Sequence, residues 1–248
     1  MGQVVGGRYE LVELLGEGGM GVVYETADAE TGRRVAVKLL SARPIAGDEA
    51  LGERFRSEAK ATAAVVSEHV VQVLDAGRDQ RTGLTYIVME LLRGESVRTL
   101  LRRLGPLPPQ LVVRIGVQIG AGLQKAHETG VVHRDIKPAN VFLARTEDGR
   151  VVVKLLDFGL AKVKMEHVAG VRGGVPRPGA AMLGSPLYLS PEQAGGRATV
   201  DHRTDIWSVG VVLYELLSRR TPHHEVRCAR CAAAWSASPR SAETCWWG

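Results

Sequence analysis

Apolar and polar positions alternate along the opening third of the chain, as they do in β-strands. Residues 9–15 alternate in this way, a glycine-rich turn follows, and residues 22–24 resume the extended pattern, so a hairpin closed by glycines is predicted. Residues 35–40 and 86–89 are further predicted strands. Between them, residues 48–67 have helical periodicity and are predicted to form an amphipathic helix. The apolar positions of that helix are Leu51, Phe55, Val65 and Val66.

The remaining pattern is mainly helical. Apolar residues recur every three or four positions over roughly 109–129, after two prolines and before a glycine, which predicts a long helix. Residues 205–217 return to helical periodicity, whereas two short apolar strands are expected at 151–153 and 154–156. Residues 160–183 are rich in glycine and proline without periodicity, which predicts a long loop of the kind that compact domains keep for function.

Length and composition indicate a soluble globular protein. The 248 residues suffice for one large domain or two small ones, and 45% of them are hydrophobic. No run approaches the roughly 18 apolar residues of a membrane span, and the N-terminus lacks a leader pattern, so a cytoplasmic location is expected. The net charge of +5 comes from scattered basic pairs, which disfavours a nucleic-acid partner. Cysteine is absent from the first 227 residues, as suits a reducing compartment.

Candidate chemistry begins in the predicted hairpin. Gly16, Gly18, Gly21 and Val23 have the spacing G-x-G-x-x-G-x-V. Glycines let a backbone close over phosphates and point its N–H groups at them, although such a turn by itself is more often only a turn. A dinucleotide-binding fold is disfavoured, because a strand and not a helix follows the glycines.

A lysine and a glutamate are predicted to pair behind this hairpin. Lys38 lies on the predicted strand 35–40, where a solvent-facing lysine is the plain alternative. On the wheel of helix 48–67, Glu58 falls within the buried stripe, whereas Glu53 faces solvent. A carboxylate on the core side needs a cationic partner, and Lys38 is the one available, so a Lys38–Glu58 ion pair is expected.

A polar cluster follows the long predicted helix. Asp135, Lys137 and Asn140 supply a carboxylate, an ammonium and an amide at fixed offsets, which form a catalytic arrangement if they converge on one ligand. Asp157 opens an Asp-Phe-Gly segment at the end of a predicted strand, a tripeptide that is commonplace in isolation. His133 is by itself more typical of a packed core histidine than of an acid or base.

Taken in order, these motifs resemble the signature set of eukaryotic-type protein kinases, and the sequence as a whole is similar to those of bacterial Ser/Thr kinases. The set also includes Ser-Pro-Glu at 190–192 and Asp-Ile-Trp at 205–207. The resemblance implies an α+β bilobal protein-kinase-like fold, with a small, mainly β N-lobe and a larger, mainly α C-lobe. The implied parts are an N-terminal tail at 1–8, the N-lobe at 9–91, a partial C-lobe at 92–218 and a divergent tail at 219–248.

The same resemblance implies ATP-dependent phosphoryl transfer to Ser or Thr hydroxyls of a protein substrate. Asp135 would accept or orient the substrate hydroxyl, and Lys137 would neutralise charge on the moving phosphoryl group. Glu58 would orient Lys38 toward the phosphates. Asn140 and Asp157 would bind Mg²⁺, whose preference for oxygen suits an amide and a carboxylate. The implied ATP-contacting residues are Leu15, Gly16, Gly18, Gly21, Val23, Ala36, Lys38, Glu90 and Leu92.

The loop after Asp157 departs from the family pattern. No Ser, Thr or Tyr lies between Gly159 and Ser185, so this segment offers no phosphate acceptor there. Any phosphorylation of the activation segment is therefore expected at Ser185, Tyr188 or Ser190.

The last 30 residues depart further. They hold all three cysteines and three of the four tryptophans and lack helical periodicity, so loss of the normal reading frame is favoured over a diverged tail or a zinc-binding extension. A C-lobe without its later helices would bury less apolar surface and is expected to be poorly stable. For the same reason, the alternative to an active kinase is a nucleotide-binding, catalytically weak scaffold or regulator. The substrate, activating signal and oligomeric state are not specified by this sequence. The zinc-ligand types in the tail are His223, His224, Cys228 and Cys231.

Overall fold

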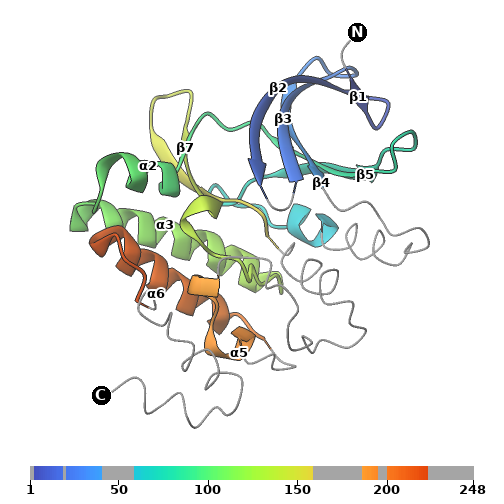
Figure 1. The fold of residues 1–248 in the computed structure, drawn as a ribbon. Helices are drawn as coiled ribbons and strands as arrows, with labels where there is room; N and C mark the ends of the chain where they lie inside the picture. Colours follow the sequence, from blue (N-terminus) through green and yellow to red (C-terminus); the bar gives the residue numbers. More distant parts are fainter. Residues whose placement is uncertain (1–2, 19–20, 41–58, 159–185, 195–199, 223–248) are drawn as a thin grey trace.

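The computed structural model describes residues 3–18, 21–40, 59–158, 186–194 and 200–222. The chain forms a β-rich lobe above a lobe built mainly from helices (Figure 1). The expected α+β bilobal fold is confirmed. In the described part of the chain, no helix is long and apolar enough to cross a membrane.

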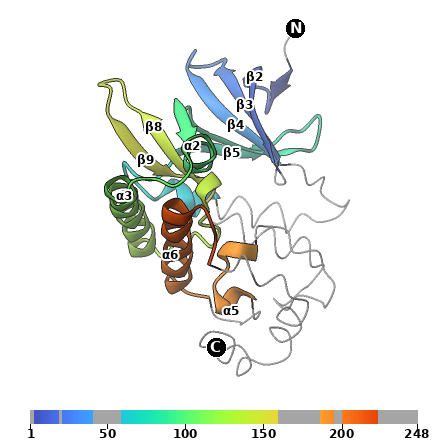
Figure 2. The same ribbon diagram turned by 60° about the vertical axis from the view of Figure 1, so that its left-hand side comes forward.

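The upper lobe is a curled antiparallel sheet of six strands in the order β1-β2-β3-β4-β6-β5 (Figure 2). The predicted hairpin is confirmed, since β2 pairs with β3 from Tyr9↔Asp28 to Gly18↔Gly21. The sheet begins ahead of residue 9, because β1 adds a short strand at its edge. Its strands are β1 Val4–Val5, β2 Tyr9–Gly18, β3 Gly21–Asp28, β4 Arg34–Leu40, β5 Val73–Arg78 and β6 Thr85–Glu90.

The helix predicted at 48–67 is described only near its end. Residues 59–63 are helical, while 41–58, with Glu53 and Glu58, lie outside the described residues. The prediction that the helix continues to Ser67 with both valines on one apolar face is wrong. The helix stops at residue 63, where the Ala63 carbonyl accepts a hydrogen bond from Gln72 Nε2 at 3.3 Å. Because successive side chains of the non-helical chain point apart, Val65 is buried and Val66 is 78% exposed.

The lower lobe centres on two long helices that lie side by side in both views, α3 Pro109–Glu128 and α6 Arg203–Ser218 (Figures 1 and 2). Both were predicted from their periodicity. Gly122 permits the close approach of α3 to the chain above it, since a Cβ there would lie 2.8 Å from the His69 carbonyl oxygen. The shorter helices are α2 Val97–Leu104, α5 Pro191–Ala194, η1 Pro138–Asn140 and η2 Pro186–Tyr188. The core shared by these elements includes Leu101, Ile115, Ile119, Leu123, Val212 and Leu216.

A second, three-stranded antiparallel sheet joins the lobes, with β7 Gly94–Ser96, β8 Val141–Arg145 and β9 Val151–Leu155 in that order. The expectation of two short strands at 151–153 and 154–156 is wrong, because one strand covers the first run and most of the second. Its hairpin partner β8 was not predicted. β8 follows the polar cluster directly, so the start of β8 fixes the end of the segment that carries Asp135 and Asn140.

Candidate active site

Lys38 and Asp157 meet at the junction of the two lobes. Lys38 Nζ donates to both carboxylate oxygens of Asp157 at 2.6 Å, across 119 residues of sequence. Lys38 is only 5% exposed on β4, and Asp157 follows β9. A buried ammonium needs an anionic partner, so this contact satisfies both groups and ties the lobes together.

The expected pairing of Lys38 with Glu58 stays a prediction, since Glu58 lies outside the described residues. Sequence reasoning gave Asp157 a role only toward a metal and missed its contact with Lys38. The sequence did indicate that Lys38 needs a carboxylate partner, because a lysine on a strand with a near-continuous apolar run is expected to be buried.

The side chains of Asp135, Lys137 and Asn140 contact one another. Lys137 Nζ donates to Asp135 Oδ2 at 2.7 Å. Asn140 Nδ2 donates to the Asp135 carbonyl oxygen at 2.8 Å and to its Oδ2 at 3.2 Å. These donors hold the Asp135 carboxylate in one orientation at the surface of the lower lobe, where Asp135 is half-buried.

Asp205 holds the backbone of this loop from below. It is fully buried near the start of α6, and its carboxylate accepts the N–H groups of His133 at 2.9 Å and Arg134 at 2.7 Å. His127 Nε2 lies 2.8 Å from the same carboxylate. Arg134 has a φ of +65°, a conformation that costs a non-glycine residue about 1–2 kcal/mol and that these contacts stabilise. Burial raises the pKa of Asp205, but the hydrogen bonds outweigh it and the pKa is lowered.

His133 connects the loop to the segment that carries Asp157. It is fully buried, its Nε2 lies 2.8 Å from the Leu156 carbonyl oxygen, and its ring is 4.4 Å from that of Phe158. The interpretation of His133 as a packed core histidine is therefore confirmed. The N–H of Leu156 donates to the Asn140 carbonyl at 2.9 Å, which brings Asn140 and Asp157 to neighbouring positions.

The glycine turn lies above this cluster at the end of β2 and β3. Gly21 has a φ of +146°, and a Cβ there would lie 1.9 Å from the Leu39 carbonyl oxygen, so only glycine fits. Among the described residues, a Cβ built on Gly16 or Gly18 would meet open space, and Leu15 is exposed.

Three of the implied ATP-contacting residues, Val23, Ala36 and Glu90, lie on the adjacent strands β3, β4 and β6. Ala36 pairs with Met89, and Met89 lines an apolar cavity of about 20 Å³ with Phe158. The carboxylate of Glu90 accepts from the Gln72 N–H at 2.8 Å and from Lys154 Nζ at 2.7 Å.

Glu90 therefore has a structural role in addition to the one predicted from sequence. Its N–H donates to the Gln72 carbonyl at 3.0 Å, so that group is already engaged. Among the described residues, Leu92 makes no backbone hydrogen bond with its N–H or carbonyl. Val23 is half-buried on the neighbouring strand β3.

Comparison with known proteins identifies this arrangement. Residues 9–235 match the protein kinase domain family. The chain belongs to that family. The match confirms the resemblance drawn from the motifs, and it continues past residue 218 into the segment that was predicted to be a divergent tail.

Bacterial relatives of this kinase domain carry serine/threonine-protein kinase names. The chain is 43% identical over 220 residues to the probable serine/threonine-protein kinase SCO3848 of Streptomyces coelicolor, which covers 88% of the chain and 31% of that protein. It is 39% identical over 217 residues to the serine/threonine-protein kinase PknB of Mycobacterium leprae, covering 87% and 33%. The chain thus spans about a third of the length of the curated relatives it matches.

A solved kinase domain has the same fold. The crystal structure of the Mycobacterium tuberculosis PknI kinase domain is similar with a TM-score of 0.69 and 25% sequence identity. The similarity covers 97% of this chain and 92% of that domain.

Two of the three expected phosphorylation sites, Tyr188 and Ser190, lie in the described part of this kinase domain. Tyr188 OH donates to Glu215 Oε2 at 2.6 Å, and burial together with this bond raises the pKa of Tyr188. Ser190 is fully buried, with its Oγ 2.6 Å from Thr204 Oγ1. Both hydroxyls make hydrogen bonds within the fold, and Ser190 would have to become exposed before it could be modified. Ser185 lies outside the described residues.

The oxygen donors fit a hard divalent cation better than a zinc ion. In the part of the chain that the structure describes, no group of three or more His, Cys, Asp and Glu side chains gathers as a metal site. Asn140 and Asp157 provide one amide and one carboxylate at neighbouring positions, which suits a cation that keeps several waters and phosphate oxygens as ligands. The zinc-ligand types at 223–231 lie outside the described residues.

Proposed function

We propose that this chain is an ATP-dependent protein kinase that transfers a phosphoryl group to Ser or Thr hydroxyls of a protein substrate. The observation that carries the proposal is the meeting of two charged clusters at the lobe junction. Lys38 contacts Asp157 at 2.6 Å, and Lys137 and Asn140 both donate to Asp135. The Leu156–Asn140 backbone bond joins the two clusters.

The nucleotide would lie beneath the glycine turn, with Mg²⁺ held by Asn140 and Asp157. The open space at Gly16 and Gly18 suits phosphates, and glycine N–H groups can point at them without side-chain interference. When bound, Mg²⁺ supplies positive charge against the phosphate oxygens. Lys38 and Asp157 compensate each other's charge in this structure; in the proposed complex Lys38 pairs with phosphate and Asp157 with the cation.

Asp135 would act on the acceptor hydroxyl. In the proposed step the hydroxyl oxygen attacks the γ-phosphorus, the bond from that phosphorus to the bridging oxygen breaks, ADP leaves, and the hydroxyl proton passes to the Asp135 carboxylate. Lys137, whose Nζ is 2.7 Å from Asp135 Oδ2, neutralises charge on the moving group. Such a reaction depends mainly on positioning, which Asp205 provides through the loop backbone.

The test is phosphorylation of a generic protein substrate by the chain and by Asp135→Asn, with nucleotide affinity measured in parallel. Loss of the acceptor carboxylate is expected to lower the transfer rate by about 100-fold or more. Nucleotide affinity should stay unchanged. Asp148→Asn is the matched control, because Asp148 is an exposed aspartate on the turn between β8 and β9.

The same experiment separates an enzyme from a scaffold. A parent chain that binds ATP and transfers no phosphate would contradict the proposal and favour the nucleotide-binding regulator. Transfer at the parent rate by Asp135→Asn would remove the role given to that residue.

A further inference from the structure

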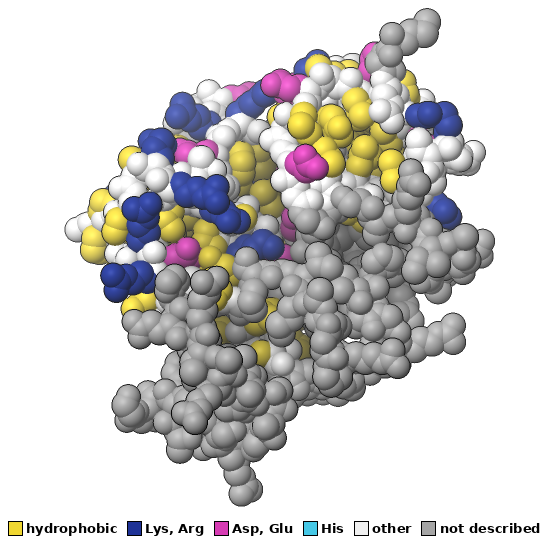
Figure 3. Space-filling model, in the orientation of Figure 1, with side chains coloured by type: hydrophobic (Ala, Val, Ile, Leu, Met, Phe, Trp, Pro, Cys, Tyr) yellow, Lys and Arg dark blue, Asp and Glu magenta, His cyan; other side chains and the backbone are white. Residues whose placement is uncertain are grey.

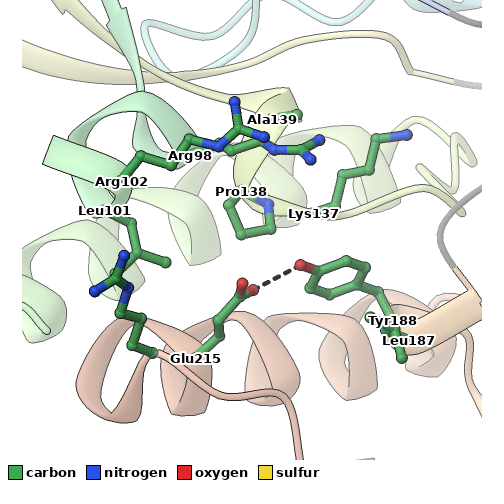
Figure 4. A pocket seen from close by; sticks show the side chains of 10 residues that line it. Arg98, Leu101, Arg102, Lys137, Pro138, Ala139, Leu187, Tyr188 and Glu215 are labelled. Atoms are coloured by element: carbon green, nitrogen blue, oxygen red, sulfur yellow. Dashed lines mark hydrogen bonds between the residues drawn. The ribbon is translucent and has the colours of Figure 1, made fainter. Parts of the chain in front are cut away.

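A pocket of about 310 Å³ lies between α2 and α6, beside residues 133–140, the catalytic loop of the proposed kinase. Figure 4 shows Arg98 and Arg102 of α2 on one side, Glu215 and Tyr188 on the other, and Pro138 between them. Known small-molecule sites measure about 300–1,000 Å³, so this pocket is at the small end of that range. Its size suits one side chain of a larger ligand better than a whole cofactor.

Positive charge dominates the pocket. Four cationic side chains line it, Arg98, Arg102, Lys137 and Arg219, against the single carboxylate of Glu215. Figure 3 likewise shows Lys and Arg side chains gathered over the α2 side of the lower lobe. The Glu215 carboxylate already accepts the Tyr188 hydroxyl, and Lys137 pairs with Asp135.

The three guanidinium groups have no carboxylate partner in the part of the chain that the structure describes. Among the residues that the structure describes, the side chains of Arg98, Arg102 and Arg219 make no hydrogen bond or ion pair. Arg98 and Arg102 are four residues apart on α2 and so project from the same face of the helix. Like charges at this spacing repel one another, and an anion between them would relieve that repulsion.

The pocket lies next to the place where the acceptor residue of the substrate would bind. Lys137 lines the pocket and also lies 2.7 Å from Asp135 Oδ2, the carboxylate proposed to receive the acceptor proton. Pro138 and Ala139, the next two residues of the catalytic loop, form part of the same wall. A substrate chain with its acceptor hydroxyl at Asp135 would therefore pass beside the pocket.

We propose that Arg98, Arg102 and Arg219 form a subsite, the arginine pocket, for an anionic side chain of the protein substrate close to the acceptor residue. The anion is a carboxylate or a phosphorylated hydroxyl, since the planar guanidinium fork binds either by paired hydrogen bonds. A basic side chain at the same substrate position is disfavoured by repulsion. This inference rests on the proposed function and adds its substrate class.

The first test measures kcat/KM for matched peptides that carry Glu, phosphoserine, Gln or Lys at each position flanking the acceptor. Two exposed ion pairs predict a preference of roughly 2- to 30-fold for the anionic peptides over Gln at one position. The preference should appear mainly in KM and should shrink as salt is raised. The Glu and phosphoserine arms decide which anion is the better ligand.

Variants connect the preference to the pocket. Arg98→Glu with Arg102→Glu should remove the preference for Glu and favour the Lys peptide instead. Arg114→Glu is the matched control, since Arg114 is an exposed arginine on α3 that does not line the pocket. Equal kcat/KM for the Glu, phosphoserine and Gln peptides in the parent, or a preference that survives the double variant, would overturn the proposal.

A binding measurement tests the arginine pocket without depending on phosphoryl transfer. Peptides with Ala at the acceptor are titrated against the parent and the double variant by fluorescence anisotropy. Anionic peptides should bind more tightly to the parent only, whether or not transfer occurs. Transfer without discrimination would reject the arginine pocket and keep the kinase function, whereas discrimination in binding without any transfer would reject the kinase function and keep the pocket.

Discussion

The two halves of the candidate active site are assembled in different ways. The nucleotide half, Lys38 with Asp157, joins segments 119 residues apart and depends on how the two lobes meet. The substrate half, Asp135 with Lys137, lies within one loop whose backbone is held by the buried side chains of Asp205 and Gln193. Asn140, which we propose to hold Mg²⁺ with Asp157, donates to Asp135 and so lies between the two halves. The first half therefore depends on a contact between the lobes, whereas the second is built within one loop. This difference predicts that a substitution in one half affects nucleotide affinity and phosphoryl transfer differently from a substitution in the other half.

The largest separation is expected from Asp205→Ala. The change leaves the buried N–H groups of His133 and Arg134 without their acceptor, so the free energy of unfolding should fall by about 3–5 kcal/mol. Urea denaturation of the parent and variant measures the loss. Asp201→Ala, at an exposed aspartate that pairs with Arg203, should lose less than about 1 kcal/mol.

The Asp205→Ala variant also tests whether the nucleotide half and the substrate half are independent. If Asp205→Ala stays folded, transfer should fall much more than nucleotide affinity, because Asp205 contacts His127, His133 and Arg134, whereas Lys38 and Asp157 contact each other. If it does not fold, Asp205→Asn preserves the shape of the side chain and serves in its place. Equal loss of nucleotide affinity and transfer would contradict the independence of the two halves.

Low pH should reduce the stability that Asp205 contributes to the folded chain. The pKa of Asp205 is lowered in the folded chain, so its contribution to stability is complete above the unfolded value of about 3.9 and is lost as pH falls through the folded value. The difference in unfolding free energy between the parent and Asp205→Asn should therefore be largest near neutral pH and narrow in acid. Chemical denaturation at several pH values measures this difference, and a constant or widening gap would contradict the assignment.

Sequence patterns were sufficient where the structure is regular and local. The long helix α3 and helix α6 follow from periodicity over many residues, and the β2–β3 hairpin follows from its glycines. The residues of the substrate half were recognised because they are close in sequence. Their convergence needs only one loop to fold.

Other features depend on tertiary contacts that a pattern does not contain. The helix that ends at residue 63 and the exposed Val66 reflect where the chain turns to meet Gln72. Asp205 looked like one polar residue of a helix motif, since its partners lie more than 70 residues away. The arginine pocket was missed because its cations come from α2, the catalytic loop and the end of α6.

The most direct measurement compares Lys38→Met with Asp135→Asn for both ATP affinity and phosphoryl transfer to a protein substrate. Lys38 belongs to the nucleotide half and Asp135 to the substrate half. Both variants are expected to transfer phosphate about 100-fold more slowly than the parent or worse. Only Lys38→Met should also weaken ATP binding. Transfer at the parent rate by either variant, or ATP affinity lowered equally in both, would contradict the proposed division of the site.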